Sequence, residues 1–344
     1  MTVASHTQPA VSGTTSSADR RQQFIQQNAI VLVFVAFIVL ATVVSGGRFI
    51  QPSNLSIILF QASVIGVLAL GQTLVMLVAG IDLSIVAIAI LAAIVMGAGG
   101  SERQQEMNLA GGILPYVGFL PAIALAIVGS LLVGAINGLA VVALRIPAFI
   151  TTLAMSLALT GLAMLTTSGT PVHYPDPFFG AFGHTKLLGL PLTVYVFFGL
   201  AIVVGLFLAR TKYGVMIYAI GGNPRAARLS GIPVERITVL IYTLSGLLGG
   251  IGGFVFLART GSVTVASGGN LLLNTIAAVV VGGISLYGGK GSIRNAVIGT
   301  LLLAGLGNLM NILLVSPHLQ DAISGLIILF AIMVNVRLDR DLVR

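Results

Sequence analysis

The stretch VGFLPAIALAIVGSLLVGAINGLAVV, residues 117–142, carries no charged residue, and its only polar side chains belong to Ser130 and Asn137. The hydrocarbon core of a membrane is about 30 Å thick, and a helix needs about 20 mainly apolar residues to cross it. With 26 residues, this stretch is long enough. It therefore predicts a transmembrane helix.

Apolar runs of this kind recur along the whole sequence. Ten runs cover residues 29–46, 55–79, 83–99, 117–142, 146–168, 191–209, 237–258, 271–287, 295–314 and 319–336. Most can span a bilayer, whereas the shorter runs at 83–99 and 271–287 suit broken or re-entrant segments. We therefore expect an all-α, polytopic membrane helix bundle of about ten transmembrane helices. Eight helices is the main alternative.

The composition argues against a soluble protein. Hydrophobic residues make up 57% of the 344 residues and charged residues only 8%, with a mean hydropathy of +1.07. A soluble domain carries about 25% charged residues, so a soluble enzyme is nearly excluded. The chain has no cysteine, and its 4 histidines lack the spacing of metal ligands. We expect no metal site.

The net charge of +8 fits a membrane topology better than nucleic-acid binding. If the N-terminus is cytoplasmic and ten helices alternate, 13 of the 17 basic residues face the cytoplasm and 4 face outward. Such an excess is what the positive-inside rule predicts. Both termini are therefore expected in the cytoplasm. The outward-facing four are Arg48, Arg103, Lys186 and Arg259.

Three regions follow from these runs. Residues 1–27 are rich in Ser, Thr and Gln and predict a disordered cytoplasmic tail. A cleaved signal peptide is the alternative, although the polar lead is long and an A-x-A cleavage site is absent. Residues 28–337 would form the transmembrane domain, and residues 338–344 a cytoplasmic C-terminal tail.

Asp82 is the only acidic residue expected near membrane depth, in the sequence Gly80-Ile81-Asp82-Leu83-Ser84. An ionisable residue there suggests a functional site. An Asp before an apolar run also suits a helix N-cap, and this is the more economical interpretation. The similar sequence Ile284-Ser285-Leu286 also follows an apolar run that ends in glycine, which hints at a weak internal repeat.

Residues 210–236 form the longest polar interior segment. The sequence Gly221-Gly222-Asn223-Pro224 predicts a turn, and a short helix should begin at Asn223 or Pro224 and end at Gly231. Such a helix at the cytoplasmic surface could dock into a groove on a partner. An ordinary solvated loop with excess positive charge is the competing interpretation.

Several glycine patterns also need an interpretation. Residues 288–292, GGKGS, resemble a phosphate-binding loop, but the full pattern requires glycine at 284 and Ser or Thr at 291, where Ile284 and Gly291 stand. A tight turn is the better interpretation. Glycine pairs spaced by four favour close helix crossings, and they occur at Gly134/Gly138, Gly246/Gly250 and Gly249/Gly253.

Polar residues inside the apolar runs could form bonds between helices or line a path for a neutral polyhydroxylated solute. They are Gln61, Gln72, Asn137, Thr151, Thr152, Asn274, Asn308 and Asn311. An ion-coupled transporter needs buried ionisable groups, and this chain offers little beyond Asp82. The remaining interpretation is a conduit for neutral solute whose energy source lies on another chain.

Four stretches carry a resemblance to a known family. They are AGIDLS at 79–84, NGLAVVALRIPAFITTLAM at 137–155, RTKYGVMIYAIGGNPRAARLSGI at 210–232 and IAAVVVGGISLYGGKGSI at 276–293. The chain resembles the permease subunits of bacterial ABC sugar importers, the ribose/xylose/arabinose/galactose-type branched permease family. It departs from the family at Ile85-Val86, where glycine is common. This position is near the expected path, so the resemblance does not identify the substrate.

The resemblance implies a non-catalytic subunit in a bacterial inner membrane that forms the path for a monosaccharide. It implies a second permease subunit, a cytoplasmic ABC ATPase that hydrolyses ATP, and a periplasmic or lipid-anchored sugar-binding protein, with no cofactor in this chain. The ATPase-coupling residues carried over are Asn223, Ala226, Ala227, Ser230 and Gly231. The path residues are Gln72, Asp82, Asn137, Phe149, Thr152 and Asn274. An ion-coupled secondary transporter of a small polar solute is the alternative.

Overall fold

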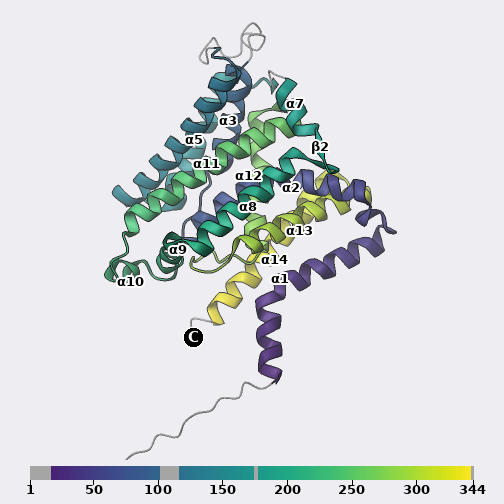
Figure 1. The fold of residues 1–344 in the computed structure, drawn as a ribbon, viewed down its shortest axis with the longest axis vertical. Helices are drawn as coiled ribbons and strands as arrows, with labels where there is room; N and C mark the ends of the chain where they lie inside the picture. Colours follow the sequence, from purple (N-terminus) through teal and green to yellow (C-terminus); the bar gives the residue numbers. More distant parts are fainter. Residues whose placement is uncertain (1–16, 101–115, 174–176, 342–344) are drawn as a thin grey trace, which may run out of the picture.

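The computed structural model describes residues 17–100, 116–173 and 177–341, and these are mostly helical (Figure 1). This confirms the expectation of an all-α bundle. The long helices are α1 (Ser17–Val44), α2 (Pro52–Leu77), α5 (Phe119–Ala143), α6 (Ala148–Thr167), α8 (Leu192–Arg210), α11 (Val234–Thr260), α13 (Ile293–Ile312) and α14 (Pro317–Asp341).

Shorter elements connect the long helices. The short helices are α3 (Ile85–Gly99), α7 (Pro177–His184), α9 (Lys212–Gly222), α10 (Pro224–Leu229), α12 (Gly268–Val281), η1 (Arg48–Ile50) and η3 (Val265–Ser267). Strand β1 (Val172–His173) pairs antiparallel with β4 (Ser262–Val263), with Val172 opposite Val263. Strand β2 (Lys186–Leu187) pairs in the same way with β3 (Leu190–Pro191), with Lys186 opposite Pro191.

Within the described residues, six helices are long and apolar enough to cross a membrane: α2, α5, α6, α8, α11 and α13. Three shorter apolar helical segments, Ile30–Val44, Ile85–Gly99 and Val265–Val281, accompany them. The last two coincide with the runs expected to be broken or re-entrant. The count of ten spans and the cytoplasmic placement of both termini stay predictions.

The helical boundaries differ from the expected tails. Helix α1 begins at Ser17, so residues 17–27 of the expected N-terminal tail belong to a helix, while residues 1–16 lie outside the described part. At the other end, α14 continues to Asp341 and includes most of the expected C-terminal tail.

The bundle has a buried centre and an apolar exterior. In its most apolar window, α2 has 72% of its residues buried and α11 has 61%, whereas α5 and α6 have 22% each. The outer faces of α5 and α6 expose large apolar side chains such as Leu132 and Leu157. In water such a surface would promote association, and in a bilayer it faces lipid or another subunit.

Glycines allow two close crossings between α11 and its neighbours. A Cβ on Gly246 of α11 would collide with the backbone of α5 at Ser130 and Gly134. A Cβ on Gly253, which lies on another face of α11, would collide with the backbone of α3 at Ala89. The two overlapping glycine pairs of α11 therefore serve two different neighbours, and the predicted close packing is confirmed.

Two short irregular segments, residues 78–84 after α2 and residues 282–292 after α12, interrupt the bundle. Both helices end in the same hydrogen-bonded turn, with a left-handed residue at Ala79 (φ 60°) and Gly283 (φ 83°). The N–H of Gly80 reaches the carbonyl of Val75, and the N–H of Ile284 reaches that of Val279. The turn pairs Gly80 with Ile284, whereas the sequence similarity pairs Ile81 with Ile284, so the shared turn is offset by one residue and the sequence repeat stays a prediction.

The packing at the α5–α11 crossing can be tested with one pair of variants. Gly134→Leu should lower the melting temperature in detergent, because overpacking of a tight contact costs about 1–3 kcal/mol. Gly129→Leu is the control, since a Cβ at Gly129 on the same helix meets no atom within 4 Å. Equal melting temperatures for the two variants would contradict the assigned crossing.

Candidate functional site

A buried polar network surrounds Asp82 in the irregular segment between α2 and α3. Oδ1 of Asp82 accepts hydrogen bonds from the backbone N–H of Ser84 (2.9 Å) and from its hydroxyl (2.6 Å). Oδ2 accepts a hydrogen bond from the hydroxyl of Ser245 on α11 (2.8 Å). All three residues are fully buried. The carboxylate therefore joins this segment to α11.

Two of the other predicted path residues join the same region. Nδ2 of Asn137 on α5 donates to the hydroxyl of Ser84 (2.8 Å). The hydroxyl of Thr152 on α6 accepts from the N–H of Leu83 (3.1 Å) and lies 3.0 Å from the carbonyl of Ile81. Side chains from three helices thus hold the irregular segment. Thr152 binds its backbone groups, which lack helical partners, whereas Asn137 and Ser245 bind the side chains of Ser84 and Asp82.

The N-cap interpretation of Asp82 is wrong in its detail. Helix α3 begins at Ile85, and Ser84 occupies the N-cap position. Asp82 lies two residues earlier, and its carboxylate receives two side-chain hydroxyls as well as one backbone N–H. It therefore acts as a cross-link between elements rather than as a cap.

The remaining path residues lie apart from this network. Gln72 on α2 is fully buried, and neither polar atom of its amide has a partner among the described residues. Phe149 on α6 is 51% exposed, and Asn274 on α12 is half-buried. The hydroxyl of Tyr242, on α11, is buried and has no hydrogen-bond partner in the described part of the chain, and it lies close to Gly80. Tyr242 and Ser245 could not be selected from the sequence, because a lone hydroxyl in an apolar run carries no distinctive pattern.

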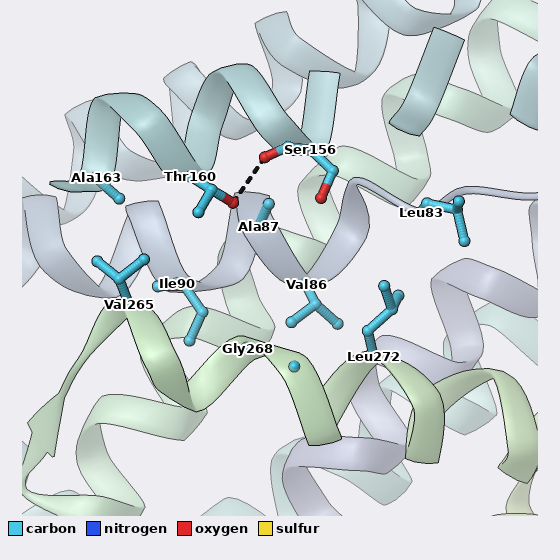
Figure 2. Close-up of a pocket in the computed structure, with 11 residues that line it drawn as sticks. Leu83, Val86, Ala87, Ile90, Ser156, Thr160, Ala163, Val265, Gly268 and Leu272 are labelled. Atoms are coloured by element: carbon cyan, nitrogen blue, oxygen red, sulfur yellow. Dashed lines mark hydrogen bonds between the residues drawn. The ribbon is translucent and has the colours of Figure 1, made fainter. Parts of the chain in front are cut away.

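A cavity of about 230 Å³ lies next to this network, between α3, α6 and the η3–α12 segment (Figure 2). None of the six predicted path residues lines it, although Leu83 follows Asp82 directly and Ser156 lies one turn after Thr152. Its lining has no charged side chain, and the Ser156 hydroxyl points into it (Figure 2). The lining consists of Leu83, Val86, Ala87, Ile90, Ser156, Thr160, Ala163, Val265, Gly268, Gly269 and Leu272.

The short helix predicted in residues 210–236 is present as α10, which lies at the opposite end of the bundle from α7 (Figure 1). The side-chain oxygen of Asn223 accepts from the N–H groups of Arg225 (3.0 Å) and Ala226 (2.9 Å), so Asn223 is the N-cap. Gly231 has φ 81° and ends the helix in the expected left-handed turn.

The five predicted coupling residues do not share one surface. Asn223, Ala226, Ser230 and Gly231 are exposed, whereas Ala227 is 4% exposed and packs into the apolar core of this chain. A larger residue at position 227 would therefore displace α10 from its seat. Leu229, which the sequence analysis did not select, is 83% exposed at the end of α10. Its exposure depends on the orientation of α10, which sequence alone does not give.

An ion pair helps to orient α10. The guanidinium of Arg228 donates from Nε to the carboxylate of Glu235 at the start of α11 (3.0 Å), and from a second nitrogen as well. Both side chains are at least half exposed, so the pair adds little to stability. Within the described residues, no cluster of three or more His, Asp or Glu side chains could hold a metal ion.

Removal of one hydroxyl tests the Asp82 network. Ser245→Ala should lower the stability of the protein by about 1–3 kcal/mol, because it leaves Oδ2 of Asp82 buried without its donor. Thr243→Val on the same helix is the control, since the Thr243 hydroxyl bonds only within its own helix, to the carbonyl of Val239. Thermal unfolding in detergent should show a clear loss for the first variant alone, and similar losses for both would refute the assignment.

The family described as "Branched-chain amino acid transport system / permease component" matches residues 54–332. The ribose import permease protein RbsC of Escherichia coli (strain K12) is 36% identical over 331 residues, which cover 94% of this chain and 98% of that protein. The fructose import permease protein FrcC of Rhizobium meliloti is 32% identical over 312 residues, or 88% of this chain and 83% of that protein.

A third relative matches a shorter region. The L-arabinose transport system permease protein AraH of Escherichia coli (strain K12) is 40% identical over 197 residues, which cover 57% of this chain and 60% of that protein. No solved structure matches this chain.

Proposed function

We propose a sugar-import function for this chain, which belongs to the family of permease components described for branched-chain amino acid transport systems. It is the membrane-spanning permease subunit of an ATP-driven importer and forms the path for a monosaccharide. The observation that carries this proposal is the 36% identity to a ribose import permease along almost the whole length of both chains.

The cavity supports a neutral solute over an amino acid. An amino acid brings a carboxylate and an ammonium group, and a site that desolvates them must offer charged or strongly polar partners. The cavity lining has no charged side chain. Its volume of about 230 Å³ lies below the range of about 300–1,000 Å³ typical of drug-sized ligands. A small sugar fits this size and carries no ionic group that would need a charged partner.

The path itself extends from this cavity along the polar network. We assign Gln72, Asp82, Asn137, Phe149, Thr152 and Asn274 to its surroundings. Asp82, Asn137 and Thr152 support the wall at the start of α3, because their hydrogen bonds fix that segment. Ser156 presents its hydroxyl to the cavity, whereas the Thr160 hydroxyl donates to the carbonyl of Ser156 in its own helix (Figure 2).

The importer requires other chains. A cytoplasmic ABC ATPase binds at α10 and hydrolyses ATP, a second permease subunit packs against the exposed apolar helices, and an extracytoplasmic sugar-binding protein delivers the sugar. This chain is non-catalytic and carries no cofactor. Its place is the bacterial inner membrane, with ten spans, both termini in the cytoplasm and the transmembrane domain at residues 28–337.

The function can be tested in vesicles that contain the chain together with its ATPase and its binding protein. Uptake of a radiolabelled monosaccharide such as ribose should require ATP and survive an ionophore that collapses ion gradients. Branched-chain amino acids under the same conditions provide the matched comparison. Uptake by this chain alone, driven by an ion gradient, would instead establish the secondary-transporter alternative, for which the relatives give no support.

If α10 docks the ATPase, the same substitution at two exposed leucines should affect ATPase binding differently. Leu229→Asp should abolish co-purification of the ATPase, because a charge at the tip of α10 would be desolvated in the interface. Leu188→Asp is the control, since Leu188 is 91% exposed but lies in the β2–β3 turn. If the Leu229 variant still co-purified with the ATPase, the tip of α10 would not be the docking site.

The role of the cavity can be tested with two phenylalanine substitutions at neighbouring positions of α6. Ser156→Phe should place a ring in the cavity and reduce uptake by about tenfold or more. A clash between this ring and the bound solute would cost at least the roughly 1.4 kcal/mol of binding free energy that a tenfold change represents. Leu157→Phe places the same ring on the exposed outer face of α6. It should leave uptake unchanged when the second permease subunit still co-purifies, which shows that this face is undisturbed. ATPase association, measured in parallel, should be normal in both. Full uptake by the Ser156 variant would exclude this cavity from the path.

A further inference from the structure

Helix α9 contacts the end of α2 and the irregular segment 282–292 through backbone atoms. Gly221, in its last turn, lies against the carbonyl of Leu77 at the end of α2 and against the N–H of Gly289 in the segment 282–292. The N–H of Gly289 also donates a hydrogen bond to that carbonyl of Leu77 (3.0 Å). One contact thus joins three elements that lie far apart in the sequence.

Only glycines allow these elements to approach so closely. A Cβ on Gly221 would collide with the Leu77 carbonyl and with the Gly289 backbone. A Cβ on Gly288 would press on Ala79, and one on Gly289 would press on Gly222. Gly288 (φ 90°) and Gly289 (φ 69°) also adopt backbone conformations that other residues rarely take. We call the set Gly221, Gly288 and Gly289 the glycine contact.

The glycine contact has α10 on one side and the Asp82 network on the other. Asn223 is the C-cap of α9 and also the N-cap of α10. Only Gly222 therefore separates Gly221 from the predicted coupling residues, which begin at Asn223. From Leu77 the chain continues through Ala79 and Gly80 to Asp82. A second link runs from the hydroxyl of Tyr218 on α9 to the carbonyl of Gly291 (2.9 Å).

Backbone contacts transmit displacement differently from side-chain contacts. A side chain can absorb a shift by a change of rotamer, whereas two backbones in direct contact have no such freedom and must move together. A displacement of α10 therefore reaches residues 78–84 and 282–292 together, and through them the helices α3 and α13 that follow.

We propose that the glycine contact is the mechanical connection through which movement of α10 is passed to the wall of the sugar path. This inference rests on the proposed function. Gly221, Gly288 and Gly289 act in it as positioning residues, since they touch neither nucleotide nor sugar.

Two neighbouring glycines provide a matched test in the assembled importer. Gly221→Ala should reduce ATP-driven uptake by about tenfold or more, because the methyl group separates α9 from the backbones of Leu77 and Gly289. Gly222→Ala should leave uptake normal, because a Cβ there meets no atom within 4 Å. Both changes add the same methyl group to the last turn of α9, and alanine is the better helix former in each case.

The readout must separate coupling from folding. The Gly221 variant should still reach the membrane, keep its melting temperature within a few degrees and co-purify with the ATPase, yet hydrolyse more ATP per sugar imported. A normal ratio of ATP to sugar at normal uptake would overturn the proposal. Absence of ATP-driven uptake by the unmodified chain would instead overturn the proposed function, so the two failures are distinguishable.

A distance measurement tests the same connection without the strained variant. The chain has no cysteine, so pairs of cysteines can carry spin labels at exposed sites. The distance between Arg225→Cys and Tyr287→Cys should stay constant between the nucleotide-free and ATP-bound importer, while the distance from Arg225→Cys to Leu188→Cys changes. If the 225–287 distance changes as much as the 225–188 distance, α10 moves independently of the segment 282–292 and the proposal fails.

Discussion

The structure depends on the satisfaction of backbone hydrogen bonds where the helices are interrupted. In a bilayer, each N–H or C=O group without a partner costs several kcal/mol, so residues 78–84 can exist at the centre of the bundle only if other groups bind them. The hydroxyl of Thr152 and the carboxylate of Asp82 bind the N–H groups of Leu83 and Ser84. The N–H of Gly289 binds the carbonyl of Leu77, directly before the segment. The neighbouring helices must therefore approach closely enough to present these groups.

Glycine makes that approach possible. Helix α11 uses Gly246 against α5 and Gly253 against α3, and this double contact brings Ser245 within reach of Asp82. Hydrophobic association contributes little between helices surrounded by lipid, so close packing and buried hydrogen bonds hold the bundle together. The apolar exterior and the polar centre are then two consequences of one packing scheme, and the centre is where a polar solute finds partners.

The sequence predicted those features that depend on neighbouring residues. The helical bundle, the short segments near 83–99 and 271–287, and the cap and end of α10 at Asn223 and Gly231 all follow from runs, caps and turns, and the structure contains them. It did not predict that Ala227 is buried, that Leu229 is exposed, or that Ser245 binds Asp82. These depend on how distant helices are rotated and on which faces they pack, and no local pattern encodes that.

Within the part of the chain that the structure describes, the placement of the buried carboxylate of Asp82 bears on how such a bundle is driven. A coupling group in an ion-driven transporter must exchange its ion, which requires access and a change of partners. Asp82 is fully buried, and both of its carboxylate oxygens are occupied by hydrogen bonds from Ser84 and Ser245. A carboxylate bound in this way acts as a structural cross-link, which keeps its partners when the neighbouring helices move. The driving force is then best applied from outside, at the end of the bundle where α10 meets solvent and where backbone contacts lead directly to the interrupted helices.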